Sequence, residues 1–192
     1  MFKRTDLRDY QERLVNEIKQ NKKLLLAVDM GLGKTIITLT EIEWMLYQDL
    51  TVNRVLIIGP KRVIQSVWKQ EAEKWAHTQK LKISIVWGTE QERIAALRTK
   101  ADVYLINREN MTWLVGLFKT AWPFDMVVVD ESSSFKSHAS QRFKALKSVR
   151  PYIKRMVLLT GTPAPNGLLD LWSQIYLLDE GERLGKSIGW LS

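Results

Sequence analysis

The sequence Asp29-Met30-Gly31-Leu32-Gly33-Lys34-Thr35 decides the fold, because of what stands on either side of it. The apolar run Leu24 to Val28 precedes it, and an apolar helical pattern starts at Ile36. Glycines let a chain turn closely around a phosphate, and the amide groups at the start of a helix face the anion. The stretch therefore predicts a phosphate-binding loop, in which Lys34 contacts the β- and γ-phosphates of a nucleotide and Thr35 holds magnesium.

One position departs from the full phosphate-loop pattern. That pattern places a glycine five residues before Gly33, where this chain has Val28. The alternative interpretation is that Gly31 and Gly33 only make a tight turn. The apolar strand before the loop and the helix after it favour phosphate binding.

Short apolar runs recur along the chain and predict a buried sheet. Most runs are continuous rather than alternating, which is typical of parallel strands covered by helices on both faces. Helical patterns separate them, so we predict a single three-layer α/β domain over residues 1–192 with a mostly parallel sheet. The expected strands are Leu24–Val28, Val55–Gly59, Ile83–Trp87, Val103–Ile106, Met126–Asp130 and Met156–Thr160. The expected helices are Leu7–Ile18, Thr35–Tyr47, Ile64–Trp75, Gln91–Leu97, Asn110–Phe118, Gln141–Val149 and Leu168–Leu178.

The composition is that of an ordinary globular protein. The chain has 192 residues, of which 45% are hydrophobic and 26% charged, and it contains no cysteine. These proportions exclude a disordered chain and a disulfide-stapled one. Its apolar runs are too short for a signal sequence or a membrane span, so a cytoplasmic location is expected. The net charge of +8 favours an anionic partner, nucleic acid first.

Nearly all of the positive excess lies between Phe135 and Arg155, a segment with seven basic residues and no acidic one. Apolar residues separate these charges, which predicts an amphipathic helix with a solvated basic face. Phosphate binding by that face is the alternative. The eight tryptophans mostly fall on apolar faces and are expected to pack in the core, whereas the two histidines are expected at the surface.

A second strand end carries two carboxylates. The apolar run Met126 to Val129 is followed directly by Asp130 and Glu131. The carboxyl ends of parallel strands lie at one edge of a sheet, so we expect these residues beside the phosphate loop. There Asp130 would orient magnesium, and Glu131 would polarise the attacking water. Taken alone, an Asp-Glu pair after a strand fits a solvated loop equally well.

A third strand end, Thr160-Gly161-Thr162, offers two hydroxyl groups on either side of a glycine. We expect these residues to sense the γ-phosphate through hydrogen bonds, the alternative being an ordinary β-turn. A GTPase would need an Asn-Lys-x-Asp segment to read guanine, and the sequence has none. A small-molecule kinase stays open in principle, but it would not explain these two strand ends together.

Together these segments resemble the first motor lobe of helicase superfamily two, and within it the Swi/Snf-like DNA translocases of bacterial or phage type. Leu7 to Gln11 resembles the Q motif, Asp29 to Thr35 resembles motif I, and Asp130-Glu131 resembles motif II. Leu158 to Ser173 is similar to the extended motif III of this branch. The resemblance implies a RecA-like P-loop NTPase domain that uses ATP and Mg²⁺ and binds duplex DNA independently of its sequence.

The resemblance also implies a role for each motif residue. Gln11 would contact the adenine base, and Lys34, Asp130 and Glu131 would be catalytic. The expected nucleotide-binding residues are Gln11, Met30, Gly31, Leu32, Gly33, Lys34, Thr35 and Ile36, with Thr35 and Asp130 at the metal ion. The expected coupling residues are Thr160, Gly161 and Thr162, and the expected nucleic-acid contacts are Pro60, Lys61, Arg62 and Asn107.

Two features depart from the family pattern. Motif II usually has His or Gln at its fourth position, where this chain has Ser133, so the relay from the γ-phosphate to motif III is expected to differ. The chain also ends at Ser192, where family members continue into a second lobe that carries an arginine finger. Such fingers contribute roughly a thousand- to a hundred-thousand-fold in turnover, so the resemblance implies a lobe that binds ATP but hydrolyses it poorly by itself. The alternative is a non-hydrolysing, nucleotide-responsive module that docks on a partner.

Overall fold

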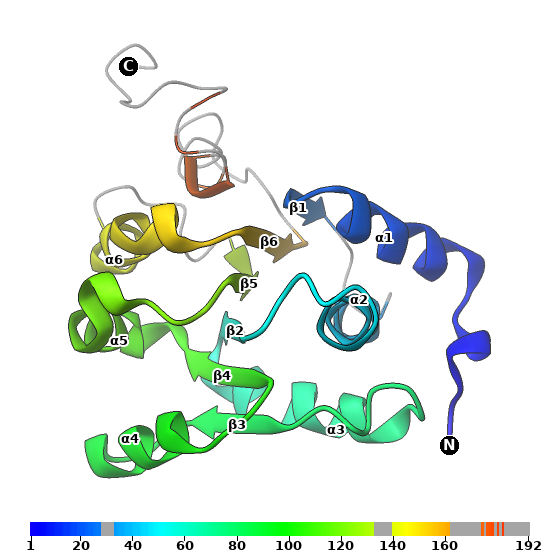
Figure 1. The fold of residues 1–192 in the computed structure, drawn as a ribbon, viewed down its shortest axis with the longest axis horizontal. Helices are drawn as coiled ribbons and strands as arrows, with labels where there is room; N and C mark the ends of the chain where they lie inside the picture. Colours follow the sequence, from blue (N-terminus) through cyan, green and yellow to red (C-terminus); the bar gives the residue numbers. More distant parts are fainter. Residues whose placement is uncertain are drawn as a thin grey trace.

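The computed structural model of the chain contains a six-stranded sheet (Figure 1). It describes residues 1–27, 33–132, 140–161, 174, 176–178, 180 and 182. The strands are β1 (Lys23–Ala27), β2 (Val55–Gly59), β3 (Ile83–Val86), β4 (Val103–Asn107), β5 (Met126–Asp130) and β6 (Arg155–Thr160). Their order in the sheet is β1-β6-β5-β2-β4-β3, and all neighbouring strands are parallel. The predicted parallel sheet is confirmed, with strand ends that differ from the predicted ones by at most one residue.

Helices cover both faces of this sheet, which gives the three layers predicted from the sequence. They are α1 (Asp9–Gln20), α2 (Lys34–Tyr47), α3 (Trp68–Lys74), α4 (Glu90–Arg98), α5 (Met111–Phe118) and α6 (Gln141–Val149). Figure 1 shows α1, α2 and α3 on one face and α4, α5 and α6 on the other. The last expected helix, Leu168–Leu178, lies mostly outside the described residues, and Gln174 and residues 176–178 of it are helical.

Alternate residues of the central strands enter two separate cores. In β2, Val55 and Ile57 pack in the core on one face, and Leu56 and Ile58 pack in the core on the other. Each of these four side chains is fully buried. Burying such a side chain stabilises the fold by about 1.5–3 kcal/mol, so a strand between two cores is apolar at every position. This is why the apolar runs in the sequence are continuous.

Local hydrogen bonds determine where some of the helices begin. The Thr89 hydroxyl accepts a hydrogen bond from the Glu92 amide, and the Glu92 carboxylate accepts one from the Thr89 amide. This reciprocal capping satisfies two amides that a helix start leaves unpaired.

The helix expected over Ile64–Trp75 is divided, because Val63–Val67 forms a π-helical segment before α3. Hydrophobic periodicity did not reveal that segment.

The basic segment is not simply a solvated helix face. Arg150 and Arg155 are 3% and 8% exposed, and both donate hydrogen bonds to main-chain carbonyls. Arg155 reaches the carbonyl oxygens of Ile18 and Lys19 at the end of α1, and Arg150 reaches those of Leu177 and Leu178. A guanidinium group has five donors, which suits the unpaired carbonyls at a helix end. The prediction of a solvated basic face is wrong for these two arginines.

The tryptophans largely follow the prediction of core packing. Trp68, Trp75 and Trp122 are buried, while the side chain of His77 is half-buried rather than on the surface. His77 Nε2 lies 2.8 Å from the Thr40 hydroxyl on α2, a tie that links the segment after α3 to that helix. Trp172, Trp190 and His138 lie outside the described residues.

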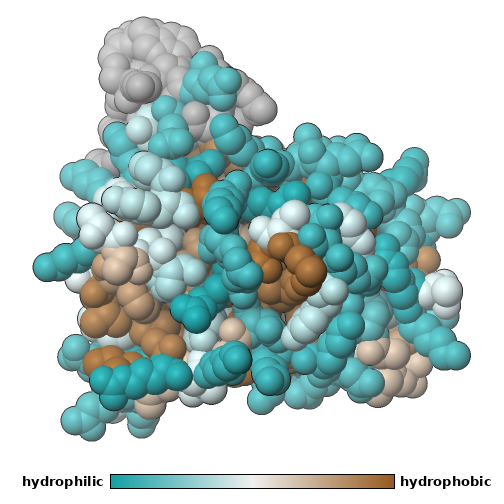
Figure 2. Space-filling model, viewed as in Figure 1, coloured by the Kyte–Doolittle hydropathy of each residue, from teal (hydrophilic) through white to brown (hydrophobic). Residues whose placement is uncertain are grey.

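The surface in the view of Figure 1 is mainly hydrophilic, as Figure 2 shows, with apolar patches between the polar side chains. Leu117 on α5 and Tyr152 after α6 are each 46% exposed. Among the described residues, no helix is both long and apolar enough to span a bilayer.

Glu41 is a carboxylate inside the α/β core. It lies on α2 with 0% exposure, and neither of its carboxylate oxygens has a hydrogen-bond partner among the described residues. Burial raises the pKa of Glu41 to about 7, although the positive charges of Lys19, Arg155 and Arg4 act to lower it. Because this pKa lies above its unfolded value, the folded state binds more protons between about pH 4.5 and pH 7. Stability is therefore lost as the pH rises through that window.

The Glu41→Gln variant tests this effect. Gln has nearly the same shape as Glu and no charge, so the stability of the variant should not fall with this titration. The difference in free energy of unfolding, variant minus parent, should therefore increase by as much as about 3 kcal/mol between pH 5 and pH 8. Urea unfolding at both pH values measures the difference. A difference between the two proteins that does not change with pH would contradict the assignment.

Candidate nucleotide site and nucleic-acid interface

Lys34, Asp130 and Glu131 come together at the carboxyl edge of the sheet. Lys34 is the first residue of α2, Asp130 is the last residue of β5, and Glu131 follows it. Lys34 Nζ lies 2.8 Å from Asp130 Oδ1 and 2.8 Å from Glu131 Oε1. These side chains are nearly a hundred residues apart in sequence, and the sheet brings them together because β1 and β5 both pair with β6.

The two carboxylates stabilise the charged form of Lys34. Burial lowers the pKa of Lys34, but its hydrogen bonds to Asp130 and Glu131 and their negative charges outweigh burial and raise that pKa above its usual value. Lys34 is therefore a cation at neutral pH. Asp130 is 1% exposed, and a carboxylate so far removed from water is costly unless it is paired. The cluster thus holds a buried carboxylate beside the cation that the sequence predicts to bind phosphate.

Trp68 is a further partner of Asp130, and sequence reasoning assigned it only to the core. Its indole Nε1 donates a hydrogen bond of 3.1 Å to Asp130 Oδ2, and the ring is fully buried. The end of the neighbouring strand β2 also lies close to Asp130, because a Cβ on Gly59 would lie 3.2 Å from Asp130 Cβ. The glycine at the end of β2 is thus the sequence signal that something packs tightly there.

Glu131 stands in a strained turn. Its φ of 56° is in the left-handed region, which costs a residue with a side chain roughly 1–2 kcal/mol. The next residue, Ser132, is fully buried and donates a hydrogen bond of 2.7 Å to Gln174 Oε1, which is also buried. Backbone strain of this kind clusters at functional sites, where the surrounding structure maintains it. Neither Ser132 nor Gln174 was predicted from the sequence, since a contact across 42 residues has no local pattern.

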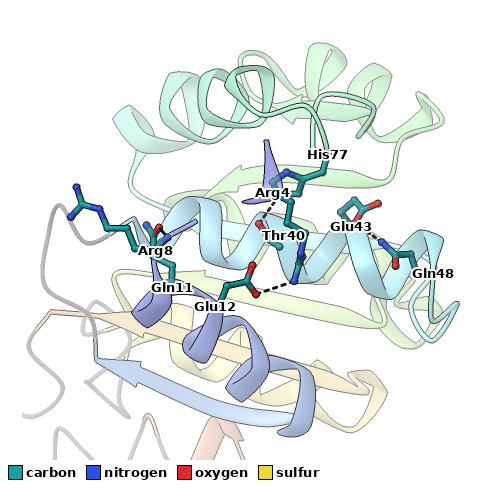
Figure 3. A network of polar contacts seen from close by, with 8 residues as sticks. All are labelled: Arg4, Arg8, Gln11, Glu12, Thr40, Glu43, Gln48 and His77. Atoms are coloured by element: carbon teal, nitrogen blue, oxygen red, sulfur yellow. Dashed lines mark hydrogen bonds and ion pairs between the residues drawn. The ribbon is translucent and has the colours of Figure 1, made fainter. Parts of the chain in front are cut away.

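Gln11 lies against Gly33, the residue just before α2. Its Oε1 accepts a hydrogen bond of 2.9 Å from the Arg8 amide, so the same side chain caps α1 (Figure 3). Gly33 has a φ of 75°, and a Cβ there would lie 2.3 Å from Gln11 Nε2. Only a residue without a side chain allows the Gln11 amide to come so close to the loop. The Q motif and motif I thus meet in space.

A cavity of about 550 Å³ opens beside this contact. Gln11, Gly33 and Ile36 form one side of it, and Trp75 forms part of the other. The N-terminal segment forms a further part of its wall, because the Phe2 amide donates to the Lys74 carbonyl and the Phe2 and Trp75 ring centroids are 5.1 Å apart. Its lining combines apolar and aromatic side chains with the charged side chains of Asp6, Arg8 and Glu71, and a cavity of this size can hold a nucleobase and its ribose.

The polar network of Figure 3 braces this part of the molecule. Arg4 forms a salt bridge of 3.2 Å with Glu12, which holds the N-terminal segment on α1. On the other side of α2, His77 contacts Thr40, and its pKa is lowered by burial and by the charge of Arg4. The imidazole is therefore neutral at pH 7. These ties fix α1, α2 and the segment after α3 around the cavity.

The described residues fit a magnesium nucleotide. The cavity leads to Gly33, and Lys34 and the buried Asp130 stand directly beyond it. Thr35 is half-buried in the first turn of α2, and Ile36 lines the cavity. Thr160 is fully buried at the end of β6, and Gly161 after it is exposed. The remaining predicted site residues, Met30, Gly31, Leu32, Thr162 and the motif II residue Ser133, lie outside the described residues.

The residues predicted to contact nucleic acid lie at the carboxyl ends of β2 and β4, at the same edge. Pro60 accepts two hydrogen bonds through its carbonyl and so starts a helical run that contains Lys61 and Arg62 in its first turn. Both cations are exposed, and Lys61 Nζ lies 4.4 Å from the centre of the Trp87 ring. Helix starts with basic side chains are favourable sites for phosphate groups.

Asn107 is placed differently from Lys61 and Arg62. It is 4% exposed, its amide donates to Glu109 Oε2, and its Oδ1 accepts a hydrogen bond from Asn110. These contacts shape the loop after β4 and turn the Asn107 side chain inward. A contact of Asn107 itself with nucleic acid stays a prediction.

The carboxyl edge is thus divided into two halves. The ends of β1, β6 and β5 carry the loop before Lys34, Thr160 with Gly161, and Asp130 with Glu131. The ends of β2, β4 and β3 carry Lys61 with Arg62, Asn107, and Trp87. The halves meet where β5 pairs with β2, at Asp130 and Gly59.

Comparison with known proteins agrees with this arrangement. The family model of the SNF2-related domain matches residues 10–185 of the chain. The putative protein p41 of Acyrthosiphon pisum secondary endosymbiont phage 1 is 39% identical over 94% of this chain, and the Caenorhabditis elegans helicase ssl-1 is 35% identical over 91%. The Saccharomyces cerevisiae protein named ISWI chromatin-remodeling complex ATPase ISW2 is 30% identical over 90% of the chain. The chain spans 40%, 7% and 16% of the lengths of these three relatives.

Among solved structures, the Sulfolobus solfataricus SWI2/SNF2 ATPase core in complex with dsDNA superposes with a TM-score of 0.74 and 27% identity, over 92% of this chain and 36% of that one. The fold is that of a RecA-like α/β domain. The chain belongs to the SNF2-related domain family and corresponds to the first lobe of a superfamily-two helicase motor.

The Gly33→Ala variant tests the contact between Gln11 and the loop. The new methyl group would require a left-handed alanine and would displace the Gln11 amide, so we expect a loss of about 1–2 kcal/mol in stability and at least about tenfold weaker ATP binding. Urea unfolding and calorimetric titration measure the two effects. Gly116→Ala is the matched control, because among the described residues no atom lies within 4 Å of a Cβ at that helical position. It should stabilise α5 by about 0.5–1 kcal/mol and leave ATP affinity unchanged.

Proposed function

We propose that the chain is the ATP-binding N-terminal lobe of a DNA-dependent ATPase that translocates on duplex DNA. The observation that carries this proposal is the convergence of Lys34, Asp130 and Glu131 at the carboxyl edge of a parallel sheet. A cation for phosphate and two carboxylates for a metal ion and a water are the parts that phosphoryl transfer to water requires. Membership of the SNF2-related family supports the same conclusion.

Each residue of the cluster has a distinct role in this proposal. Lys34 releases the two carboxylates and pairs with the β- and γ-phosphates, to which its charge is better matched. Asp130, freed at Oδ1, and the Thr35 hydroxyl hold magnesium and its waters. Glu131 orients the attacking water and accepts its proton. Magnesium, when it is bound with the nucleotide, neutralises the charge that develops on the phosphate oxygens.

Adenine recognition follows from the position of Gln11 at the mouth of the cavity. A glutamine amide can accept a hydrogen bond from the N6 amino group of adenine and donate one to N7. Guanine has an acceptor at the position of that amino group, so the same amide would face it with one repulsive contact. We therefore propose ATP rather than GTP as the nucleotide, with Ile36 and Trp75 forming apolar walls.

The partner in this proposal is the DNA backbone, contacted through Lys61 and Arg62 at the start of their helix. Backbone contacts have little dependence on base sequence and weaken as the salt concentration rises. Turnover by the lobe alone should be slow, because an arginine finger would come from a second lobe. The whole motor is therefore proposed to need that second lobe.

The decisive experiment is the steady-state ATP turnover of this chain with and without duplex DNA, together with ATP binding. Lys34→Ala should weaken ATP binding at least about tenfold, because a charge-assisted hydrogen bond to phosphate is lost. Lys69→Ala, an exposed lysine on α3, is the control. Intact ATP binding with negligible turnover supports the proposal, whereas unchanged ATP affinity in Lys34→Ala would overturn it. Strong DNA-stimulated turnover would mean that the chain supplies its own arginine finger, for example by pairing with itself.

Removing both cations of the proposed DNA contact should weaken DNA binding. For Lys61→Ala/Arg62→Ala we expect an affinity reduced at least about tenfold and a salt dependence shallower by about two phosphate contacts. Fluorescence anisotropy of a labelled duplex at several salt concentrations measures both quantities. Lys82→Ala/Lys100→Ala removes the same charge at the opposite edge of the sheet, just before β3 and β4. Equal losses in the two double variants would indicate nonspecific attraction rather than this site.

A further inference from the structure

Trp68 connects the two halves of the carboxyl edge. Its indole N–H donates to Asp130 Oδ2, while Lys34 Nζ lies against Asp130 Oδ1. The two carboxylate oxygens therefore have different neighbours: one faces the nucleotide side, and the other faces α3. Carboxylates that hold a metal ion are commonly fixed in this way by an outer hydrogen bond, whose loss typically weakens metal binding or activity 10- to 100-fold.

The helix that carries Trp68 also carries the cations of the nucleic-acid half. Lys61 and Arg62 lie in its first turn, the π-helical segment Val63–Val67 follows, and α3 begins at Trp68. The run from Lys61 to Trp68 is helical throughout. No loop separates these residues, so a displacement of the Trp68 indole also moves the hydrogen-bonded backbone that carries Lys61 and Arg62.

The π-helical segment sets the direction in which Trp68 points. One residue added to an α-helix rotates all that follows by about 100°, because each residue turns the helix by that angle. Such segments are rare and occur frequently at functional sites. Ile64 within it is fully buried and lies close to the same place, since a Cβ on Gly59 would be 3.5 Å from Ile64 Cδ1 and 3.2 Å from Asp130 Cβ. Ile64 and Asp130 thus both lie against Gly59, and Trp68 contacts Asp130 directly.

We infer that Trp68 is a positioning residue which holds Asp130 by one oxygen and couples the nucleotide site to the DNA-contacting start of its own helix. This inference rests on the proposed function. When Lys34 leaves Asp130 Oδ1 for a nucleotide, the carboxylate reorients, and the indole and its helix move with it. Coupling between two binding sites is reciprocal, so ATP and DNA must alter each other's affinity by the same factor.

The test measures the affinity of a labelled duplex for the chain with and without saturating Mg-ATP. In the parent protein the two affinities should differ at least about fivefold, the lower end of typical coupling between sites. In Trp68→Phe this ratio should fall to within about twofold of unity, because the hydrogen bond is lost. DNA affinity without nucleotide should stay within about twofold of the parent value. A loss of stability alone would not change the ratio, so it separates a coupling role from a structural one.

Trp122→Phe is the matched control. Trp122 is similarly buried, at 8% exposure, and its Nε1 has no hydrogen-bond partner among the described residues. The control should keep the parent ratio. If Trp68→Phe fails to fold, 3-benzothienylalanine at position 68 keeps the shape of the indole and replaces only its N–H by sulfur.

The outcomes are separable. A ratio that persists after removal of the N–H, or a parent ratio of one, would overturn the coupling role of Trp68 while ATP and DNA still bind. Failure of the parent chain to bind either ligand would overturn the proposed function itself, and the coupling role with it.

Discussion

The rest of the structure depends on the ion pair between Lys34 and the carboxylates of Asp130 and Glu131. Asp130 is almost fully buried at the centre of the sheet edge, and removal of one partner from a buried pair costs about 3–5 kcal/mol. Lys34 therefore stabilises the fold in the absence of nucleotide, and in the proposed function it binds phosphate in the presence of nucleotide. If one cation serves both purposes, as proposed, nucleotide binding would remove a stabilising contact from the carboxylates, and the ligand and its metal ion would have to replace it.

The parallel sheet brings Lys34 and the two carboxylates together. All six strands end at the same edge, so short loops from strands distant in the sequence meet there. β5 and β2 lie side by side in the middle of the sheet, where the nucleotide half meets the nucleic-acid half. Gly59 allows this close approach, since a larger residue would press on Asp130. The distance between the two proposed binding sites is set by the spacing of neighbouring strands.

The sequence was sufficient for the elements and for the charged centre of the site. Short apolar runs, most of them continuous, predicted each of the six strands of the described sheet, and the residues at strand ends predicted that Lys34 and Asp130 would meet. It was not sufficient for contacts such as Trp68 with Asp130 or Ser132 with Gln174. These contacts join side chains that have no local pattern, and a buried indole looks the same in a sequence whether or not its N–H is used. Burial of Arg150 and Arg155 was missed for the same reason, because helix ends that need donors are known only after folding. Trp172, Ser133 and Thr162 fall outside the described residues.

The position of β1 in the sheet has a consequence for the order of folding. β1 lies at one edge and pairs with β6, in a register that joins Lys23 to Met156. During synthesis its partner emerges 133 residues later, which at ribosomal speeds means an interval of roughly 7 to 27 seconds. Throughout that time an apolar strand that leads into the phosphate loop has no neighbour to pair with. Among the strands of the described sheet, β1 thus waits longest for its partner, and until then only local packing such as that of α1 against α2 can form around it.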